Sequence, residues 1–204
     1  MSRLGATYHQ LREFDKAIKD YENSRVILEP LLADEPAPIL FETYHGLAHS
    51  YHDNATELTA GRQSTADAVA AEQLSKAEEY YKKAAVYQQK IKSDNPLLTV
   101  VSLKNLAQLY LDIGRFDDAE QNLKAVVDVY KTVEYYPGAG LEDALKELAE
   151  FYRNRSRSED AARTYNELID LYENNANFYH LEPQRIRELA DNYSELGQIY
   201  IAMK

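Results

Sequence analysis

Histidine side chains are concentrated near one point of this sequence, where they could bind a metal ion or a polar ligand. His45, His49 and His52 are spaced by four and three residues, which places them on one face of a helix, and His9 lies in the neighbouring segment. Neutral imidazole binds Zn²⁺, Ni²⁺ or Cu²⁺, and an i, i+4 pair can reach one ion. A metal-binding module built on His45, His49 and His52 is one hypothesis, and histidines that hydrogen-bond a ligand or water are the other. Gly46 stands where a zinc protease of the His-Glu-x-x-His type needs its glutamate, which excludes that class.

A second set of polar residues recurs at fixed distances from five tyrosines, which are Tyr8, Tyr51, Tyr110, Tyr152 and Tyr193. Basic or potentially basic residues stand six before a tyrosine (His45, Lys104, Lys146, Arg187) or one after it (His9, His52, Arg153), and His49 and Gln108 stand two before. On a protein of formal net charge -11, these side chains predict a groove that captures a peptide carrying carboxylates. Protonation of the histidines near pH 6.5 would add to its positive charge. The competing interpretation is a solvated helix face whose charges, such as Lys146 and Glu150, neutralise one another.

The elements that position these residues are predicted from the neighbours of the tyrosines. Each tyrosine follows a leucine by four residues and a small residue by three. These offsets lie on one face of a helix, with the small residue where another backbone must come close. The leucines are Leu4, Leu47, Leu106, Leu148 and Leu189, and the small residues are Gly5, Ala48, Ala107, Ala149 and Ala190.

A second helix is predicted to follow each tyrosine, because another small residue stands nine positions later (Ala17, Ala119, Ala161, Ala202) and opens a further apolar stripe. In the second unit the matching residue, Ala77, comes 26 residues after Tyr51. The insertion at 53–73 is poor in large apolar residues and is expected to be a mobile loop, with helix extending back from Ala77 over 67–73. Gly114 and Gly197 are expected in tight hairpin turns, and the prolines are expected between helices.

Together these residues resemble the tetratricopeptide repeat family, most clearly in LKNLAQLYLDIGRFDDAEQNLKAVV from Leu103 to Val127. The intervals between the tyrosines are 43, 59, 42 and 41 residues, and without the insertion the period is similar to that of kinesin light chains, which bind cargo peptides. The resemblance implies an all-α solenoid of helical hairpins, wound as a right-handed superhelix whose first helices line the concave side. Its units are expected at about 1–30, 39–95 with the insertion at 53–73, 99–136, 141–177 and a truncated 183–204, in a single array over 1–204.

Composition excludes several functional classes. The net charge works against binding to nucleic acid or to an anionic membrane surface, and no stretch reaches the ~18–20 apolar residues of a membrane span. The absence of cysteine excludes disulfides, thiolate metal sites and a cysteine nucleophile. Because no phosphate loop, Gly-x-Ser-x-Gly elbow or cofactor motif occurs, we predict no enzymatic activity and no cofactor. The N-terminus lacks a signal-peptide core, and the compartment stays open, with the cytoplasm favoured.

The predicted function is a non-enzymatic protein–protein interaction module that binds a peptide or protein partner. Its expected groove residues are His9, His45, His49, His52, Lys104, Gln108, Lys146, Arg153 and Arg187. The alternative from another class is a structural segment that self-associates, because neither end of the array carries the polar cap that solenoids need for solubility. For the same reason we expect the chain to be a piece of a longer protein.

Overall fold

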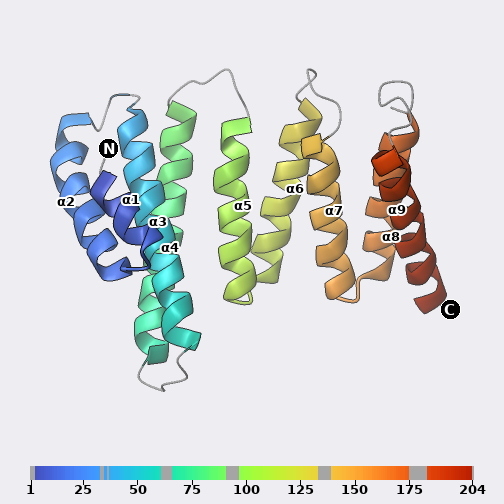
Figure 1. Ribbon diagram of the computed structural model, residues 1–204, viewed down its shortest axis with the longest axis horizontal. Helices are drawn as coiled ribbons and strands as arrows, with labels where there is room; N and C mark the ends of the chain where they lie inside the picture. The colour runs from blue at the N-terminus through green and yellow to red at the C-terminus, as the bar shows by residue number, and fades with distance from the viewer. Residues whose placement is uncertain are drawn as a thin grey trace. The chain divides into compact units, whose positions relative to one another are not determined.

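The computed structural model describes residues 3–32, 35, 37–60, 66–90, 97–132, 139–174 and 183–203, and the regular structure within them is helical (Figure 1). The helices of this part are α1 (Arg3–Gln10), α2 (Phe14–Leu32), α3 (Pro38–Ala60), α4 (Ala66–Lys90), α5 (Leu97–Asp112), α6 (Phe116–Thr132), α7 (Ala139–Asn154), α8 (Ser158–Asn174) and α9 (Pro183–Ala202). The prediction of an all-α fold is confirmed. None of these helices combines the length and apolar character that crossing a membrane requires.

The chain divides into two compact units, Met1–Ala119 and Glu120–Lys204. In the first unit α1 packs on α2 and α3 packs on α4, while α2 also packs on α3 and α4 on α5. In the second unit α7 packs on α8 and α8 packs on α9. Each unit is therefore a stack of helical hairpins, and the single array over 1–204 stays a prediction.

Three of the hairpins turn in the same way. The residue four positions after the tyrosine has a left-handed backbone in each, with φ of 59° at Arg12, 73° at Gly114 and 56° at Ser156. The next backbone N–H then donates to the tyrosine carbonyl over 2.8 to 2.9 Å, as Arg115 does to Tyr110. This bond closes the helix end, and it explains why glycine is expected at the position and why Ser156 can replace it only at some strain.

The predicted seam between first and second helices is confirmed in the middle of the chain. Tyr51, Tyr110 and Tyr152 are 6%, 4% and 4% exposed, and the leucines and alanines that precede them are buried. The small residues that open the second helices are fully buried, namely Ala17, Ala77, Ala119 and Ala161. Close approach of two backbones at these alanines is what makes each hairpin compact.

The last unit departs from the prediction. α9 continues without a turn through Gly197 to Ala202, so these residues neither form a hairpin turn nor open a second helix. Its buried side chains are Asn192, Leu196 and Ile199, whereas Tyr193 is 48% exposed. The physical reason is that α9 packs chiefly on α8 among the described helices, and the face that carries Tyr193 stays uncovered.

Two further predictions about local structure were wrong. The insertion is largely helical: α3 runs on to Ala60 and α4 begins at Ala66, which confirms only the backward extension from Ala77. The extension of α3 is held by packing, since Ala55 is fully buried and Asn54 Nδ2 donates to Asp15 Oδ1 over 3.1 Å. Pro30 lies inside α2, but only two residues follow it, so the helix loses a single backbone hydrogen bond near its end.

Candidate functional site

The predicted groove residues are divided between the two units. His9 lies on α1, the other three predicted histidines on α3, and Lys104 and Gln108 on α5, all in the first unit. Lys146 and Arg153 lie on α7 and Arg187 on α9, in the second unit.

The histidines of the first unit form a cluster around one tyrosine. The ring centroids of His45 and His49 are 4.5 Å apart, and those of His9 and His49 are 6.1 Å apart. Tyr81 on α4 meets the rings of His45, His49 and His52 edge to face at 6.2, 5.4 and 6.2 Å. The predicted convergence of four histidines at one end of the first helices is thus what the structure contains.

The Nε2 atoms of His45, His49 and His52 have hydrogen-bond partners within the fold, and His9 Nε2 lies within ion-pair distance of a carboxylate. Asn105 Nδ2 donates to His45 Nε2 over 2.8 Å and lies 3.3 Å from His49 Nε2. His52 Nε2 lies 2.8 Å from Asp112 Oδ2, and His9 Nε2 lies 3.0 Å from Asp53 Oδ2. Within the described ranges, no three histidine or carboxylate side chains are grouped so that they could hold a metal ion. The metal hypothesis therefore gains no support from the geometry.

Burial makes the centre of the cluster a poor base. It lowers the pKa of His45, and it lowers the pKa of His49 to about 4, with the neighbouring histidines contributing in the same direction. His49 is consequently neutral between pH 8 and 6. The expectation that it gains charge over that range was wrong, because an exposed imidazole was assumed. His49 is half-buried, and its Nε2 lies 3.3 Å from Asn105 Nδ2.

A hollow of about 380 Å³ opens beside the cluster, between α1, α2 and α3. Its apolar side includes Tyr21 and Phe41, and its polar side includes His9 and His45. Gly46 is required here, since a Cβ atom at this position would lie 2.4 Å from Tyr21 Cζ. The glycine of the HGLAH segment thus admits the Tyr21 ring, which sequence reasoning had not assigned to it.

The basic residues of the second unit differ in how far they are engaged. Arg153 is paired with Glu195 of α9. Lys146 and Arg187 are exposed and form no ion pair within the described part of the chain. They occupy the same register position on consecutive first helices, α7 and α9. In the first unit, Gln108 donates to Asp112 Oδ1 over 2.8 Å on its own helix.

A cavity of about 420 Å³ lies next to Lys146, among α7, α8 and α9. It contains a network around Arg185, which pairs with Glu142 Oε2 and lies 3.3 Å from Glu188 Oε2. Tyr172 Oη donates to the same Glu188 oxygen over 3.1 Å. Burial alone would raise the pKa of Glu188, and hydrogen bonds from Gln184 and Tyr172 outweigh that effect and lower it. No local pattern in the sequence predicts this network.

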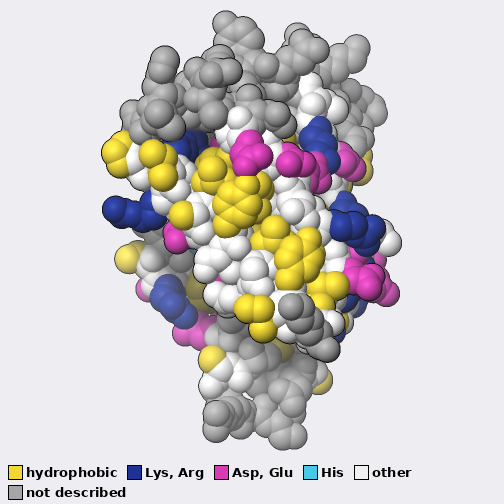
Figure 2. All heavy atoms as spheres, turned by 90° about the vertical axis from the view of Figure 1, so that its right-hand side faces the viewer, with side chains coloured by type: hydrophobic (Ala, Val, Ile, Leu, Met, Phe, Trp, Pro, Cys, Tyr) yellow, Lys and Arg dark blue, Asp and Glu magenta, His cyan; other side chains and the backbone are white. Residues whose placement is uncertain are grey.

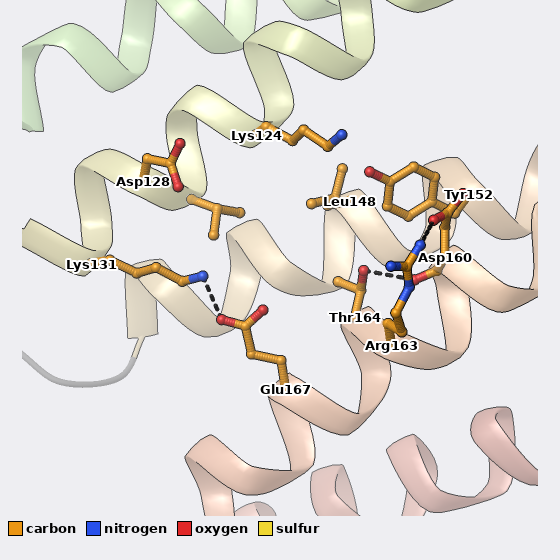
Figure 3. Close-up of a pocket in the computed structure, with 10 residues that line it drawn as sticks. Lys124, Asp128, Lys131, Leu148, Tyr152, Asp160, Arg163, Thr164 and Glu167 are labelled. Carbon is orange, nitrogen blue, oxygen red and sulfur yellow. Dashed lines mark hydrogen bonds and ion pairs between the residues drawn. The ribbon is translucent and has the colours of Figure 1, made fainter.

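A third hollow, of about 360 Å³, is formed by α6, α7 and α8 (Figure 3). Figure 3 shows Lys124, Lys131 and Arg163 around it, with Lys131 beside Glu167 and Arg163 beside Asp160. Lys131 Nζ is 2.5 Å from Glu167 Oε1, Lys124 Nζ is 2.6 Å from Glu120 Oε1, and Arg163 pairs with Asp160. Because each of these three cations is already paired with a carboxylate, none of them is left to bind an anionic ligand.

A further interaction repeats between consecutive hairpins and was not predicted from the sequence: a glutamate accepts a hydrogen bond from a tyrosine hydroxyl and pairs with an arginine. Glu78 accepts from Tyr110 Oη over 3.0 Å and pairs with Arg115, whose guanidinium lies 4.5 Å from the Tyr110 ring centroid. Glu120 accepts from Tyr152 Oη over 3.0 Å and pairs with Arg157 in the same way. The sequence contains a pattern that predicts these bonds. Where a glutamate directly follows the buried alanine of one repeat, as Glu78 and Glu120 do, an arginine stands five residues after the tyrosine of the next repeat, as Arg115 and Arg157 do.

Comparison with known proteins agrees with this architecture. Sequence models of the tetratricopeptide repeat family match residues 66–132 and residues 1–24. The crystal structure of BtubC (BKLC) from P. vanneervenii is similar, with a TM-score of 0.62 and 18% identity over 98% of this chain and 70% of that one. A kinesin light chain-like protein of Podosopora anserina with nearly identical TPR-like repeats aligns with a TM-score of 0.59 and 18% identity, over 98% of this chain and 93% of that one. No curated protein matches the sequence significantly.

The stacked hairpins with a buried leucine, small-residue and tyrosine seam define a helical-repeat protein. The parts of the chain that the family models match, residues 66–132 and 1–24, are tetratricopeptide repeats. Repeats of this family generally mediate protein–protein interaction, and proteins built from them are generally non-enzymatic scaffolds.

Proposed function

We propose that this chain is a non-enzymatic module that binds a partner protein through a peptide laid along the exposed faces of its first helices. The partner contributes carboxylates, which Lys146 and Arg187 hold. The observation that carries the proposal is that both cations are exposed, have no internal ion pair within the described residues and share one register position on α7 and α9. Charge-assisted hydrogen bonds to such groups contribute about 1.5 to 3 kcal/mol each when partly desolvated.

The test uses a fluorescently labelled peptide that alternates Glu and Leu, together with a matched peptide in which Gln replaces every Glu. Fluorescence anisotropy should show binding of the acidic peptide only. Its affinity should fall as salt rises, because the screening length shrinks to about 8 Å at 0.15 M. Lys146→Glu combined with Arg187→Glu should weaken binding about tenfold or more.

Lys19→Glu is the control for charge reversal, since Lys19 is exposed on α2, away from the first-helix faces. It should leave the anisotropy titration unchanged. Equal affinity for the acidic peptide and its Gln counterpart would contradict the proposal, and so would a double reversal without effect.

A second candidate function, a self-associating structural segment, is supported by the uncovered face of α9. The side chains on this helix that stay exposed include Ile186 at 51%, Tyr193 at 48%, Tyr200 at 47% and Ile201 at 74%. Figure 2 shows hydrophobic side chains gathered into a band on the side of the molecule where α9 lies. Exposed apolar bands of this kind mark interaction surfaces, and a second copy of the chain offers the same band.

Sedimentation equilibrium over a range of protein concentrations tests this candidate. The mass should rise with concentration, and Tyr193→Lys combined with Ile201→Lys should hold the chain as a monomer. Val86→Lys with Val101→Lys is the control, because both valines are also about half exposed, at 54% and 46%, but lie on α4 and α5. A wild-type chain that stays monomeric, or identical behaviour of the two variants, would exclude association through α9.

A further inference from the structure

The cavity of about 420 Å³ among α7, α8 and α9 has an excess of negative charge. Four carboxylates line it, and only two cations do. The carboxylates are Glu142, Asp143, Glu188 and Asp191, and the cations are Lys146 and Arg185. Leu168 and Tyr172 provide an apolar part of the wall. A negative, partly apolar cavity is suited to a cation that is carried on an aliphatic stem.

Glu142 is the residue that points to a ligand. It lies in the first turn of α7 and is only 5% exposed. Its Oε2 is paired with Arg185, but its Oε1 is buried and has no hydrogen-bond partner among the described residues. An ionised carboxylate oxygen in such a place is costly unless a donor reaches it. A ligand that suits this oxygen is therefore a hydrogen-bond donor.

Neither cation of the cavity fills this role, since Glu142 Oε1 has no hydrogen-bond partner among the described residues. Nη1 of Arg185 already serves Glu142 Oε2, the Glu188 carboxylate at 3.3 Å and the Tyr172 hydroxyl at 3.5 Å. Lys146 is exposed and forms no ion pair within the described residues. Since the carboxylates outnumber the cations, a charged donor is favoured over a neutral one.

We propose that this cavity binds the cationic side chain of an arginine or lysine of the partner protein, with Glu142 Oε1 accepting its hydrogen bond. Asp143 and Asp191, which are both exposed, add negative charge around the cavity. The aliphatic stem lies against Leu168 and Tyr172. The inference goes beyond the carboxylate contacts proposed above and rests on that proposal only for the source of the side chain. A partner that uses both sites carries both signs of charge.

The test titrates the full chain with N-acetyl-arginine amide or N-acetyl-lysine amide and follows backbone amide shifts by NMR. N-acetyl-citrulline amide is the neutral control, because it keeps the shape of arginine without the charge. We expect saturable shifts in the first turns of α7 and α9 with the arginine compound, the lysine compound or both, and none with citrulline. Comparing the first two tells a guanidinium site from an ammonium site. No saturable shifts with either cation, or equal shifts with citrulline, would overturn the proposal.

Variants at the cavity make the test independent of folding effects. Asp143→Asn combined with Asp191→Asn alters only exposed side chains and should weaken binding of the cation about tenfold. Asp170→Asn, an exposed residue of α8 outside the cavity lining, should leave binding unchanged. Glu142→Gln should abolish binding while circular dichroism shows that the helices persist. If this variant unfolds, the binding of the aspartate double variant tests the proposal instead. Equal binding by the wild type and the aspartate double variant would overturn the proposal. Because the probes are small molecules, this result does not depend on whether acidic peptides bind.

Discussion

The hydroxyl of Tyr152 donates a hydrogen bond of 3.0 Å to Glu120 Oε1, which ties α7 to the preceding second helix, α6. Tyr110 and Glu78 form the same bond between α5 and α4. Each of these tyrosines therefore has two roles. Its ring packs between the first and second helices of its hairpin, and its hydroxyl bonds a glutamate of the preceding hairpin; this tyrosine–glutamate–arginine set is called the lock. The next equivalent position lacks the lock, since Ala162 replaces the glutamate and Gln198 replaces the arginine.

We predict that Glu120→Gln destabilises the second unit. Burial alone would raise the pKa of Glu120, but hydrogen bonds from Arg157, Lys124 and Tyr152 outweigh it and lower the pKa to about 2. Because this value lies below the ordinary 4.5, the carboxylate stabilises the fold above pH 4.5 and loses that contribution as pH falls toward 2. With Arg157 and Lys124 41% and 53% exposed, we expect a loss of about 1 to 3 kcal/mol near neutral pH.

Urea denaturation followed by circular dichroism measures this loss at neutral and at acidic pH. The variant should be less stable than the wild type at neutral pH and should converge with it in acid. Glu159→Gln, at an exposed residue in the first turn of α8, is the control and should cost at most about 0.5 kcal/mol. A Glu120 variant as stable as this control would show that the lock contributes nothing.

The seam could be predicted from the sequence because it depends on residue size at fixed helical offsets, as the burial of Leu106, Ala107 and Tyr110 shows. The lock was harder to find, because it joins polar side chains that are 32 residues apart, and no local periodicity brings them together. The prediction of a hairpin around Tyr193 was wrong for a related reason. The pattern at Tyr193 is that of a first helix, but its burial requires a covering helix, which periodicity alone does not supply.

The same distinction applies to the histidines. Their spacing correctly predicted that they share a face, but it could not reveal that Asn105 of α5 lies against His45 and His49. Burial lowers the pKa of His45 and His49, which favours their neutral form. The cavity at Glu142 was missed for the same reason, since its walls come from three helices and its key contact to Arg185 spans 43 residues.

A second prediction concerns the acid sensitivity of the first unit. Burial lowers the pKa of His49 from 6.5 to about 4, so the unfolded chain takes up a proton between these values and the folded chain does not. Stability should therefore be intact above pH 6.5 and fall as pH decreases, by about 2 kcal/mol at about pH 5 from this residue. His49→Gln should remove that part of the slope in urea denaturation and leave the part due to His45. An unchanged slope would mean that His49 is protonated in the folded protein.

A third prediction compares two alanines of the same column. Ala149 is fully buried at the seam, and replacing it with leucine should destabilise the second unit by about 1 to 3 kcal/mol through overpacking. Ala190 occupies the equivalent position on α9 but is exposed, so Ala190→Leu should change stability by at most about 0.5 kcal/mol. Thermal unfolding of the two variants measures the difference. Similar losses in both would show that the face of α9 is covered in solution.

The last prediction separates a hairpin turn from a continuous helix at two glycines that the sequence treats alike. Gly114 has φ of 73°, a backbone that alanine adopts only with strain, so Gly114→Ala should destabilise the fold by about 1 to 2 kcal/mol. Gly197 lies inside α9, and a Cβ atom there would meet nothing within 4 Å, so Gly197→Ala should stabilise by about 0.5 to 1 kcal/mol. Urea denaturation followed by circular dichroism measures the change in the free energy of unfolding for both variants. Ser156→Gly extends the comparison, because glycine should relieve the left-handed strain at φ of 56° and raise stability. If Gly197→Ala instead destabilises the chain as Gly114→Ala does, residue 197 is in a turn and α9 is two helices in solution.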